Sequence, residues 1–284
     1  MAIIATINDI DMFKELESEV DAIIVPTPFS SYVLTRFNLE EIKYIVNIAE
    51  KPLYFLVNGL YEDKDMEGVR DLILEYKDQV HYIFGDLGVL DILIDFSLEN
   101  RSIYNPTTLI CNSLDANEYL DYGLEAVGLS NEITVNDQVN ITKKVNNKTL
   151  IKVFGFHPMF ISKRKLITTY LEHINKEKKT KKGYLVEERR PDKLPVIEDI
   201  DGTTIYRHYP INLIKEIESL KIANYLYFSS TFLSTKTLIE TVRIYKKAIN
   251  NEISSKEAFE ILSSMFLYSD GFMYNDSIYE ERDF

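Results

Sequence analysis

Residues 53–86 read LYFLVNGLYEDKDMEGVRDLILEYKDQVHYIFGD, and this stretch contains the pattern that decides the fold. Two short apolar runs, Leu53–Asn58 and His81–Phe84, flank a window with apolar residues at helical spacing. The apolar residues on one face of that window are Val69, Leu72, Ile73 and Tyr76. The two runs do not alternate strictly with polar residues, which is typical of strands covered on both faces. The stretch therefore predicts a strand, a helix and a second strand parallel to the first.

The same alternation of apolar runs and amphipathic windows continues along the chain. Asn38, followed three positions later by Glu41, is typical of a helix N-cap with its capping-box partner. Helices are also expected at 212–220 and 235–249, on either side of the last apolar run. Eight strands are expected in all: Ala2–Ile7, Ala22–Thr27, Leu53–Asn58, His81–Phe84, Ser102–Asn105, Ala126–Leu129, Thr149–Phe154 and Asn224–Phe228. Eight β/α units predict an α/β protein with a closed, TIM-like (β/α)8 barrel. An open doubly wound sheet remains an alternative, although no G-x-G-x-x-G follows the first strand.

The alternation is interrupted between the seventh and eighth strands. Residues 161–210 contain the basic run Lys176–Lys182 and then an extended segment in which Asp201-Gly202 is typical of a hairpin turn. We therefore expect residues 1–250 to form the barrel, with 161–210 as a small, basic, β-rich insertion at its mouth. Residues 251–284 are expected to form a helix, Ser255–Leu267, and a polar tail that pack on the barrel.

The composition restricts the class of protein. The chain has 284 residues, 45% of them hydrophobic, and a formal net charge of −13. It has no run of about 18 consecutive apolar residues, the length that crosses a bilayer. The N-terminal residues lack the basic region of a signal peptide. The single cysteine, Cys111, excludes an internal disulfide and fits a reducing compartment. We expect a cytoplasmic protein with no membrane segment.

The negative net charge opposes binding to nucleic acid, because that affinity comes mostly from neutralised phosphates. The charge is uneven, however. Between Ile161 and Lys193, eleven Lys and Arg residues stand against five Asp and Glu residues. Such a segment is typical of a solvated surface, and it also fits a binding site for a polyanion or an acidic partner. Tyr184 is the one aromatic residue near these lysines that we count as a stacking group.

In a barrel of this type the chemistry lies where the strands end and run into the following loops. Polar residues occupy those positions at Asn58, Asp86, Asn105, Glu132, His157 and the pair Ser229–Ser230. Polar residues are also common at any boundary between a strand and a loop. Their convergence on one rim favours a pocket there, without specifying a reaction.

Five segments of the chain form a recognisable series. They are Asp86–Val89 (DLGV), Ser130–Thr134 (SNEIT), Val153–Leu166 (VFGFHPMFISKRKL), Glu187–Thr203 (with EERR and PVIEDIDGT) and Gly271–Tyr274 (GFMY). In this order they resemble the peptidase U32 family. That family carries a D-L-G-V-type turn, an S-x-E-[LI]-[ST] segment, a V-F-x-H-G hallmark with two cysteines, an E-x-R…P-x-x-E-D-x-x-G-T segment and a G-F-x-Y ending. The resemblance covers most of the chain, and its specificity comes from the order of the segments.

The chain departs from the family in its cysteines. Larger members, which resemble oxygen-independent hydroxylation proteins, hold an iron–sulfur cluster, and such a cluster needs four thiolates. Both hallmark cysteines are absent here, and Lys165 stands where the second would be. The eighth strand ends in Ser229-Ser230 instead of the acidic-Gly-Arg ending common in the family. We therefore expect no cofactor within this chain.

The rim residues supply candidates for chemistry. His157 could donate to a carboxylate or phosphate, or move a proton, or simply bond to loop backbone. Arg164 and Lys165 follow it and could hold an anion or belong to a solvated basic face. The catalytic candidates are His157, Glu132 and Asp86, and the substrate-binding candidates are Asn58, Asn105, Arg164 and Lys165. No metal site is expected, because the four histidines are scattered. Cys111 is expected to be a packed small hydrophobe.

Three hypotheses of function remain. The resemblance implies a subunit used by Gram-positive bacteria in tRNA wobble-uridine 5-hydroxylation. In that scheme a longer, cysteine-bearing paralogue carries the redox chemistry, and this chain shapes the site or holds tRNA. The family name implies a collagenase-like peptidase, a hydrolase, although no H-E-x-x-H or G-x-S-x-G occurs. The third hypothesis is a catalytically silent interaction scaffold. We prefer the first.

Overall fold

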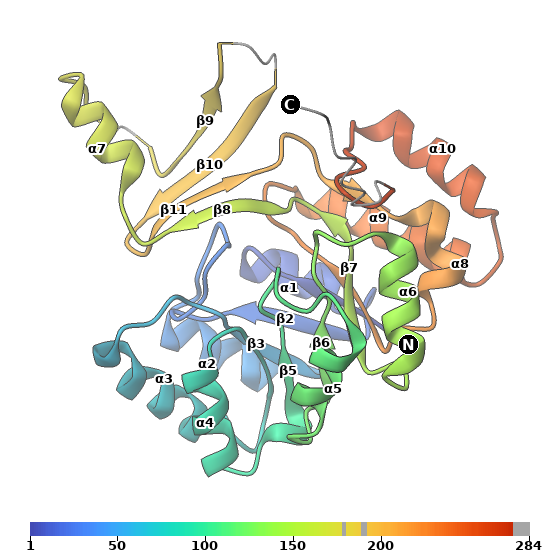
Figure 1. Cartoon of the computed structure of the whole chain (residues 1–284), viewed down its shortest axis with the longest axis horizontal. Coiled ribbons are helices and arrows are strands. Elements are labelled where there is room, and N and C mark those ends of the chain that lie inside the picture. The colour runs from blue at the N-terminus through green and yellow to red at the C-terminus, as the bar shows by residue number, and fades with distance from the viewer. Residues whose placement is uncertain (178–179, 189–191, 275–284) are drawn as a thin grey trace, which may run out of the picture.

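Eight parallel strands close into a barrel, and a smaller sheet stands at one end of it (Figure 1). A computed structural model describes residues 1–177, 180–188 and 192–274 of the chain. Each strand from β1 to β6 pairs with the next along the chain. Strand β13 pairs with both β7 and β1, so the ring is complete. The strands are β1 (Ala2–Thr6), β2 (Ala22–Pro26), β3 (Leu53–Val57), β4 (His81–Phe84), β5 (Ser102–Tyr104), β6 (Ala126–Gly128), β7 (Thr149–Gly155) and β13 (Tyr225–Phe228). The predicted TIM-like (β/α)8 barrel is confirmed, and each predicted strand end lies within one residue of the observed one.

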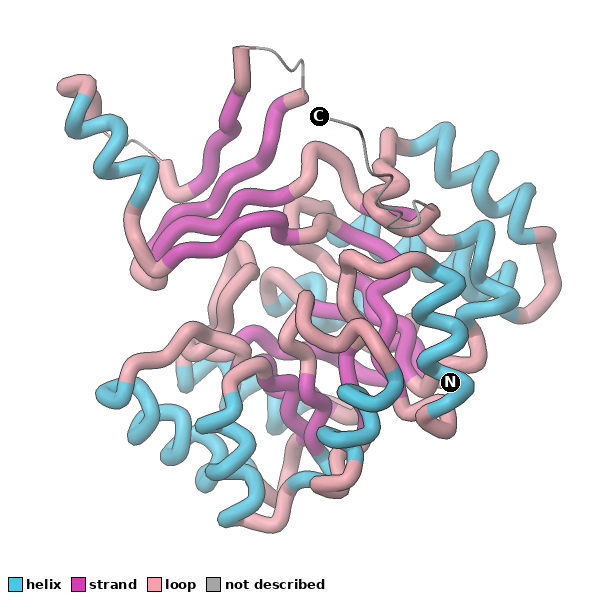
Figure 2. The backbone as a smooth tube through the Cα atoms, viewed as in Figure 1, coloured by secondary structure: helices cyan, strands magenta, loops and turns pink. Residues whose placement is uncertain are grey.

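Helices surround the barrel, shown in cyan around the magenta strands in Figure 2. They are α1 (Ile10–Leu16), α2 (Leu39–Ile48), α3 (Asp63–Tyr76), α4 (Leu87–Asp95), α5 (Ser113–Leu120), α6 (Val135–Lys144), α8 (Ile217–Leu220), α9 (Thr235–Ile249) and α10 (Ser255–Met265), with short 3-10 turns η1 (Glu99–Arg101) and η2 (Ile214–Glu216). The capping box predicted for Asn38 and Glu41 is present at the start of α2. The predicted apolar face of α3 is buried. The C-terminal helix α10 packs on η2 and α9.

The strands are apolar on both faces because both faces are covered. On β3, Tyr54 and Leu56 belong to an inner cluster that fills the lumen, whereas Phe55 and Val57 belong to the outer core beneath the helices. Side chains alternate between the two faces at a period of two residues. Burial on both sides removes the need for polar residues along a strand, and this explains the uninterrupted apolar runs in the sequence.

One predicted helix is wrong in its first part. Residues 212–220 do not form a continuous helix, because Ile211–Asn212 form a short strand, β12, antiparallel to β7. The Asn212 side-chain oxygen then accepts the N–H of Ile214 at 3.3 Å and the hydroxyl of Tyr245 at 2.8 Å. These bonds fix the chain in an extended turn, so regular helix is confined to α8.

The insertion between β7 and β13 is a four-stranded antiparallel sheet in the order β8-β11-β10-β9. Its elements are β8 (Pro158–Ser162), α7 (Leu166–His173), β9 (Lys182–Val186), β10 (Lys193–Asp199) and β11 (Gly202–Tyr206). The predicted Asp201-Gly202 turn is confirmed, since Asp199 pairs with Gly202 across it. The sheet begins three residues before the expected 161, and the sequence did not predict α7. Parts of the expected segments lie outside the described residues, namely Lys178, Lys179, Arg189, Arg190 and the tail 275–284.

A glycine is required at the turn of this sheet. Gly202 has a φ of +117°, a backbone conformation that side chains disfavour. A Cβ there would lie 1.9 Å from the carbonyl oxygen of Ser162 on the neighbouring strand β8. The G in the P-x-x-E-D-x-x-G-T segment therefore allows β8 and β11 to pair closely.

The two acidic residues of the same segment hold the insertion together and tie it to the barrel. The buried carboxylate of Glu198 accepts the N–H groups of Ile167 at 2.6 Å and Thr168 at 3.0 Å, which are otherwise unpaired at the start of α7. Asp199 pairs with Arg36, on the loop after β2, at 2.9 Å. These contacts give Glu198 and Asp199 structural roles.

A polar network closes the opposite end of the barrel, where the strands begin. Glu125, just before β6, accepts hydrogen bonds from the hydroxyls of Tyr54 (3.0 Å) and Tyr225, and its other oxygen lies 3.0 Å from Nδ1 of His81. Burial alone would raise the pKa of Glu125, but the hydrogen bonds from His81, Tyr225 and Tyr54 outweigh it and lower the pKa below its usual value. The carboxylate therefore stays ionised, and both of its oxygens have hydrogen-bond partners.

Replacing Glu125 with alanine should destabilise the protein by about 3 kcal/mol, because two hydroxyls and an imidazole lose their acceptor. The lowered pKa means that this contribution is present at neutral pH and is lost as the pH falls through the folded-state pKa of Glu125. Urea unfolding followed between pH 7 and pH 4 measures both effects. The gap between Glu125→Ala and the natural chain should narrow on acidification. The exposed Glu67 offers the control, and a Glu67→Ala variant as unstable as Glu125→Ala would contradict the assignment.

Candidate functional site

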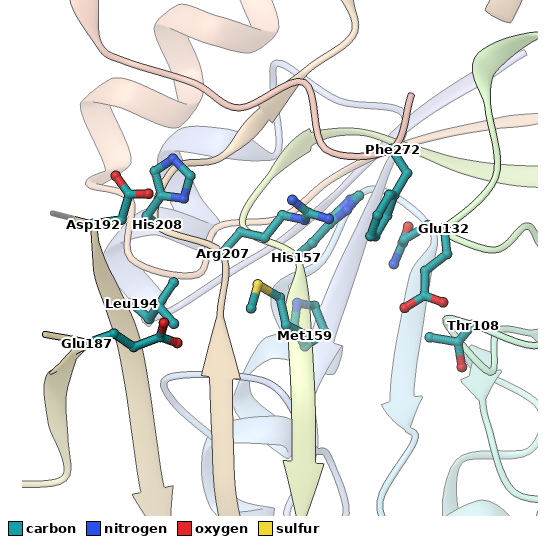
Figure 3. A pocket seen from close by; sticks show the side chains of 12 residues that line it. Thr108, Glu132, His157, Met159, Glu187, Asp192, Leu194, Arg207, His208 and Phe272 are labelled. Atoms are coloured by element: carbon teal, nitrogen blue, oxygen red, sulfur yellow. The ribbon is translucent and has the colours of Figure 1, made fainter. Parts of the chain in front are cut away.

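A pocket of about 520 Å³ opens beside the barrel mouth, between the insertion sheet and the loop that follows β6 (Figure 3). Its volume lies within the range of small-molecule sites. Its lining includes Glu132, His157, Met159, Arg207, His208 and Phe272, together with Thr108 after β5 and Glu187, Asp192 and Leu194 at the ends of β9 and β10. It lies at the end of the barrel where the parallel strands end, which is where barrel chemistry is found.

Arg207 is the central basic group of this pocket. Its guanidinium lies over the ring of Phe272, 4.5 Å from the centroid, and Figure 3 shows the two side chains beside His157. Its backbone N–H donates to the carbonyl of His157 at 3.0 Å, which continues the pairing of β11 with β8 past the strand ends. Burial lowers the pKa of Arg207, and the charge of Glu132 acts in the opposite direction. The stacking and the backbone bond hold the guanidinium in one place.

His157 lies at the back of the pocket and is only 3% exposed. Burial, followed by the charges of Lys152 and Arg207, lowers the pKa of His157 well below its usual range. The imidazole is therefore neutral at physiological pH. Its Nε2 makes no hydrogen bond within the described part of the chain. A neutral, buried imidazole with an unused nitrogen can bind one polar group of a ligand.

Glu132 faces Arg207 from the other side of the pocket. Its backbone N–H donates to the side chain of Ser130 at 3.1 Å, so the residue sits in a short turn after β6. The preceding Asn131 donates its N–H to the carbonyl of Thr107 at 3.0 Å, which ties this turn to the loop after β5. The carboxylate is thereby presented from a fixed backbone.

The GFMY segment positions Phe272. Met273 is 1% exposed, and its carbonyl accepts the N–H of Val135 at the start of α6 at 3.0 Å. Gly271 before it has a φ of +60°. With Met273 anchored in the core, the neighbouring Phe272 is held over the pocket, where 44% of its surface remains exposed.

The structure places the seven candidate residues in four locations. His157 and Glu132 line the pocket together. Asn58 and Asn105 line a second, smaller cavity on the barrel axis. Asp86 caps helix α4, where its side chain accepts the N–H of Gly88 at 2.7 Å, and it lines neither cavity.

Arg164 and Lys165 lie elsewhere. The sequence suggested that they share a loop with His157. Strand β8 (Pro158–Ser162) instead separates His157 from these two residues, which lie at the far end of the insertion sheet. Arg164 lies in the turn before α7, where its carbonyl accepts the hydroxyl of Thr203 at 2.8 Å. Neither residue lines the pocket.

Sequence reasoning missed Arg207 and Phe272. Phe272 lies in the GFMY segment, so a signal was present, but nothing local indicated what its ring would contact. Arg207 follows β11, and its place beside His157 depends on the pairing of two strands that are separated by about forty residues. No spacing rule within one element predicts such a neighbour.

Cys111 corrects another expectation, because it is exposed instead of packed. It lies in the loop between β5 and α5, directly before the N-cap Asn112, and its sulfur is 3.5 Å from the carbonyl of Thr108. The apolar run before it is short: Ile110 is buried, but Leu109 is 61% exposed. The run therefore ends at Ile110, and the thiol faces solvent.

The described residues contain neither a cluster of metal-ligating side chains nor a membrane-spanning helix. Within residues 1–177, 180–188 and 192–274, no three His, Cys, Asp or Glu side chains gather to hold a metal ion. One cysteine cannot supply the four thiolates of an iron–sulfur cluster, so the residues do not fit that group. None of the described helices has both the length and the apolar character needed to cross a membrane.

Comparison with known proteins identifies the family of this chain. The model of peptidase family U32 matches residues 13–278. The chain belongs to peptidase family U32. This U32 chain is also 26% identical over 239 residues to a protein of Bacillus subtilis (strain 168) named tRNA hydroxylation protein P2, covering 79% of this chain and 77% of that protein. Among solved structures it is similar to a chitinase from Rhizomucor miehei, with a TM-score of 0.44, 10% identity, and coverage of 87% of this chain and 100% of the chitinase. A likeness at that score supports no statement about function.

The thiol of this U32 chain should react as a free surface group. We expect one thiol of the folded protein to react with Ellman's reagent without denaturant, because Cys111 is exposed. The free energy of unfolding of Cys111→Ser in urea should equal that of the natural chain within about 0.5 kcal/mol, because an exposed side chain contributes little to the core. A thiol that reacts only after unfolding would contradict the exposed position.

Proposed function

We propose that this chain takes part in tRNA wobble-uridine 5-hydroxylation in the cytoplasm, as a subunit without a cluster that works with a longer, cysteine-bearing paralogue. One observation carries the proposal: the pocket brings Arg207, Glu132 and Phe272 together in a space that fits a nucleobase. The relative named tRNA hydroxylation protein P2, which aligns with 79% of the chain, points in the same direction.

The pocket has the groups that a uracil ring requires. The base presents two carbonyl oxygens with an N–H between them. Arg207 supplies donors for a carbonyl oxygen, and Glu132, on the opposite wall, supplies an acceptor for the N–H. The exposed part of Phe272 offers a surface for stacking, as in other sites that bind a base removed from its stack.

The role assigned to this chain is to hold the base. Replacing the C5 hydrogen of uridine with a hydroxyl removes two electrons from the ring, so the reaction needs an electron acceptor. The guanidinium, carboxylate and imidazole groups of this pocket bind and position polar atoms, and they carry no redox couple. In the proposal, the paralogue supplies the oxidising chemistry to a base that this chain presents.

A second surface suits the rest of the RNA. Helix α7 and strand β9 project beyond the barrel in Figure 1, and between them lies a groove of about 270 Å³. Tyr170 and Tyr184, 61% and 67% exposed, line it together with Lys181 and Lys182. Aromatic rings beside lysines are typical of surfaces that bind single-stranded nucleic acid. The sequence identified only Tyr184 in this role, because the helix that presents Tyr170 was not predicted.

Deleting the gene should lower 5-hydroxyuridine-type modification in total tRNA, measured by mass spectrometry of nucleoside digests. A plasmid with the natural gene should restore it. Arg207→Ala should restore about a tenth or less, because a bidentate or stacked guanidinium is worth about 1–3 kcal/mol at a base-binding site. Arg207→Lys keeps the charge but loses the planar guanidinium, so the modification it restores should lie between the levels restored by Arg207→Ala and by the natural gene.

The matched control is Arg164→Ala, which removes an arginine from the turn before α7, outside the pocket. It should complement nearly as well as the natural gene. An unchanged nucleoside profile in the deletion strain would contradict the proposed function. Full complementation by Arg207→Ala would favour the hypothesis of an interaction scaffold. Cleavage of gelatin by the purified protein that is lost in His157→Ala would favour the hypothesis of a peptidase.

The groove makes a separate prediction about RNA affinity. Tyr170→Ala combined with Tyr184→Ala should weaken tRNA binding by about tenfold or more in a filter-binding assay with the paralogue present, because stacking contributes about 1–3 kcal/mol per base. Tyr122→Ala removes a ring of similar exposure from the loop between α5 and β6 and should leave binding unchanged. Equal affinities for the natural chain and the double variant would remove the groove from the RNA path.

A further inference from the structure

A second cavity lies in the barrel lumen and adjoins the pocket that holds Arg207 at Pro158, which lines both. Its volume is about 40 Å³. Its polar lining includes Asn58, Asn105, Lys152, Tyr206, Tyr227 and Ser229, with Ser31, Tyr32 and Thr107 from the loops after β2 and β5. Tyr206 comes from β11 of the insertion sheet and the others from the strands of the ring or the loops that follow them, so barrel closure and the insertion together form the cavity. Apolar residues such as Leu56 and Ile83 form the rest of its wall.

Lys152 is the charged group of this cavity. It lies in the middle of β7 and points into the lumen, where its ammonium donates to the carbonyl of Phe156 at 2.8 Å and lies 5.6 Å from the centre of the Tyr227 ring. These contacts hold the amine at the upper end of the lumen. Part of its surface remains accessible, and that surface borders the cavity.

Lys152 has no counter-ion. Across the three described stretches of the chain, no carboxylate lies within ion-pair distance of its ammonium, and burial is the one cause that lowers its pKa, to about 7. A charge inside a protein is costly unless it is paired, and the usual remedies are an opposite charge or loss of the proton. The lumen at Lys152 is thus prepared for an anion.

Three other polar groups of the cavity have unused donors, whereas the Tyr227 hydroxyl accepts the hydroxyl of Thr6 at 2.8 Å and Ser229 donates to Thr231 at 3.2 Å. The Tyr206 side chain is 1% exposed, and its hydroxyl makes no hydrogen bond to any described residue. Asn58 uses its side-chain oxygen to accept the N–H of Ser31 at 2.9 Å, and its NH2 group bonds to no side chain or backbone in the described ranges. The amide of Asn105 is likewise unengaged where the structure is described. Unused donors on several walls indicate an acceptor in the middle.

We infer that the axial cavity is a binding site for a small monocarboxylate, held by the Lys152 ammonium and by donors from Tyr206 and Asn58. The inference is independent of the tRNA function proposed above, since it concerns a different cavity. One water occupies about 10–15 Å³ measured in this way, so about 40 Å³ admits roughly three or four non-hydrogen atoms. That is the size of formate or acetate. A single ammonium neutralises one negative charge and leaves a phosphate dianion half compensated.

The pH dependence of binding follows from the groups around the amine. His157 stays neutral, because burial and the neighbouring cations hold its pKa well below its usual range. Burial raises the pKa of Tyr32, Tyr206 and Tyr227, so these hydroxyls keep their protons, and Arg207 stays charged. Lys152 is the group that titrates. Because the ammonium is the group of the cavity whose charge changes in this range, affinity should fall about tenfold from pH 6 to pH 8.

The test is calorimetric titration of the full-length protein with sodium acetate at pH 6 and constant ionic strength, compared with acetamide as a neutral ligand of the same shape. Acetate should bind saturably, and acetamide should bind with an affinity at least about tenfold lower. Lys152→Met should weaken acetate binding by about tenfold or more. This variant should fold, with a melting temperature equal to or above that of the natural chain, because it removes an unpaired charge from the lumen.

Lys165→Met, at the start of α7 and outside the cavity, is the control and should bind acetate like the natural chain. Tyr206→Phe keeps the ring but removes the hydroxyl, and it should weaken acetate binding by a smaller factor than Lys152→Met. Acetate that binds Lys152→Met with unchanged affinity, or acetate and acetamide that bind equally, would overturn the inference. Chloride that competes as well as formate would show a general anion site and would overturn the assignment to carboxylates.

Discussion

The pairing of β6 with β7 is the constraint on which the rest of the structure depends. Val127 pairs with Thr149 and Gly128 with Leu150, and these bonds convert a curved sheet into a ring. A closed ring of parallel strands has all its carboxyl ends on one rim, so residues far apart in the sequence become neighbours there. Asn58, Asn105 and Ser229 border the same axial cavity for this reason. In an open sheet, the ends of β6 and β7 would not be joined, and the lumen that contains Lys152 would not exist.

The insertion sheet adds the second level of organisation. The antiparallel pairing of β11 with β8 brings Arg207 beside His157, and the acidic pair Glu198 and Asp199 fixes the sheet, one through the start of α7 and the other through Arg36 on the barrel. Asp199 also keeps its charge: burial opposes ionisation, but Arg36 and the neighbouring hydrogen bonds lower its pKa. The family segment that contains these residues therefore acts in two ways: Glu187, Asp192 and Leu194 line the pocket, whereas Glu198 and Asp199 fix the sheet that carries them. It determines where the pocket wall stands, and the pocket side chains then determine what can bind.

The two ends of the barrel lumen differ in how their polar groups are satisfied. At the end where the strands begin, Glu125 is bonded to Tyr54, Tyr225 and His81, and the network is complete. At the rim, Lys152 and Tyr206 leave donors unused. A satisfied buried network rigidifies a fold, whereas an unsatisfied one costs stability unless a ligand completes it. This contrast separates a structural end of the barrel from an end arranged for binding, which matches the placement of function in barrels of this kind.

The sequence by itself determined the eight strands to within one residue, the parallel barrel, the Asp201-Gly202 hairpin and the family, because each of these depends on local periodicity, turn chemistry or the order of short segments. It also placed His157 and Glu132 on the working rim, since both directly follow strands. Only the tertiary structure decided that Arg207 and Phe272 join them and that Arg164 and Lys165 do not. It also decided that Cys111 is exposed and that Lys152 lies in the lumen without a counter-ion among the described residues. Each of these depends on which strand lies beside which, or on where an apolar run leaves the core. Contacts between distant segments are set by the closure of the ring and by antiparallel pairing across the insertion, and no local pattern encodes the resulting neighbours.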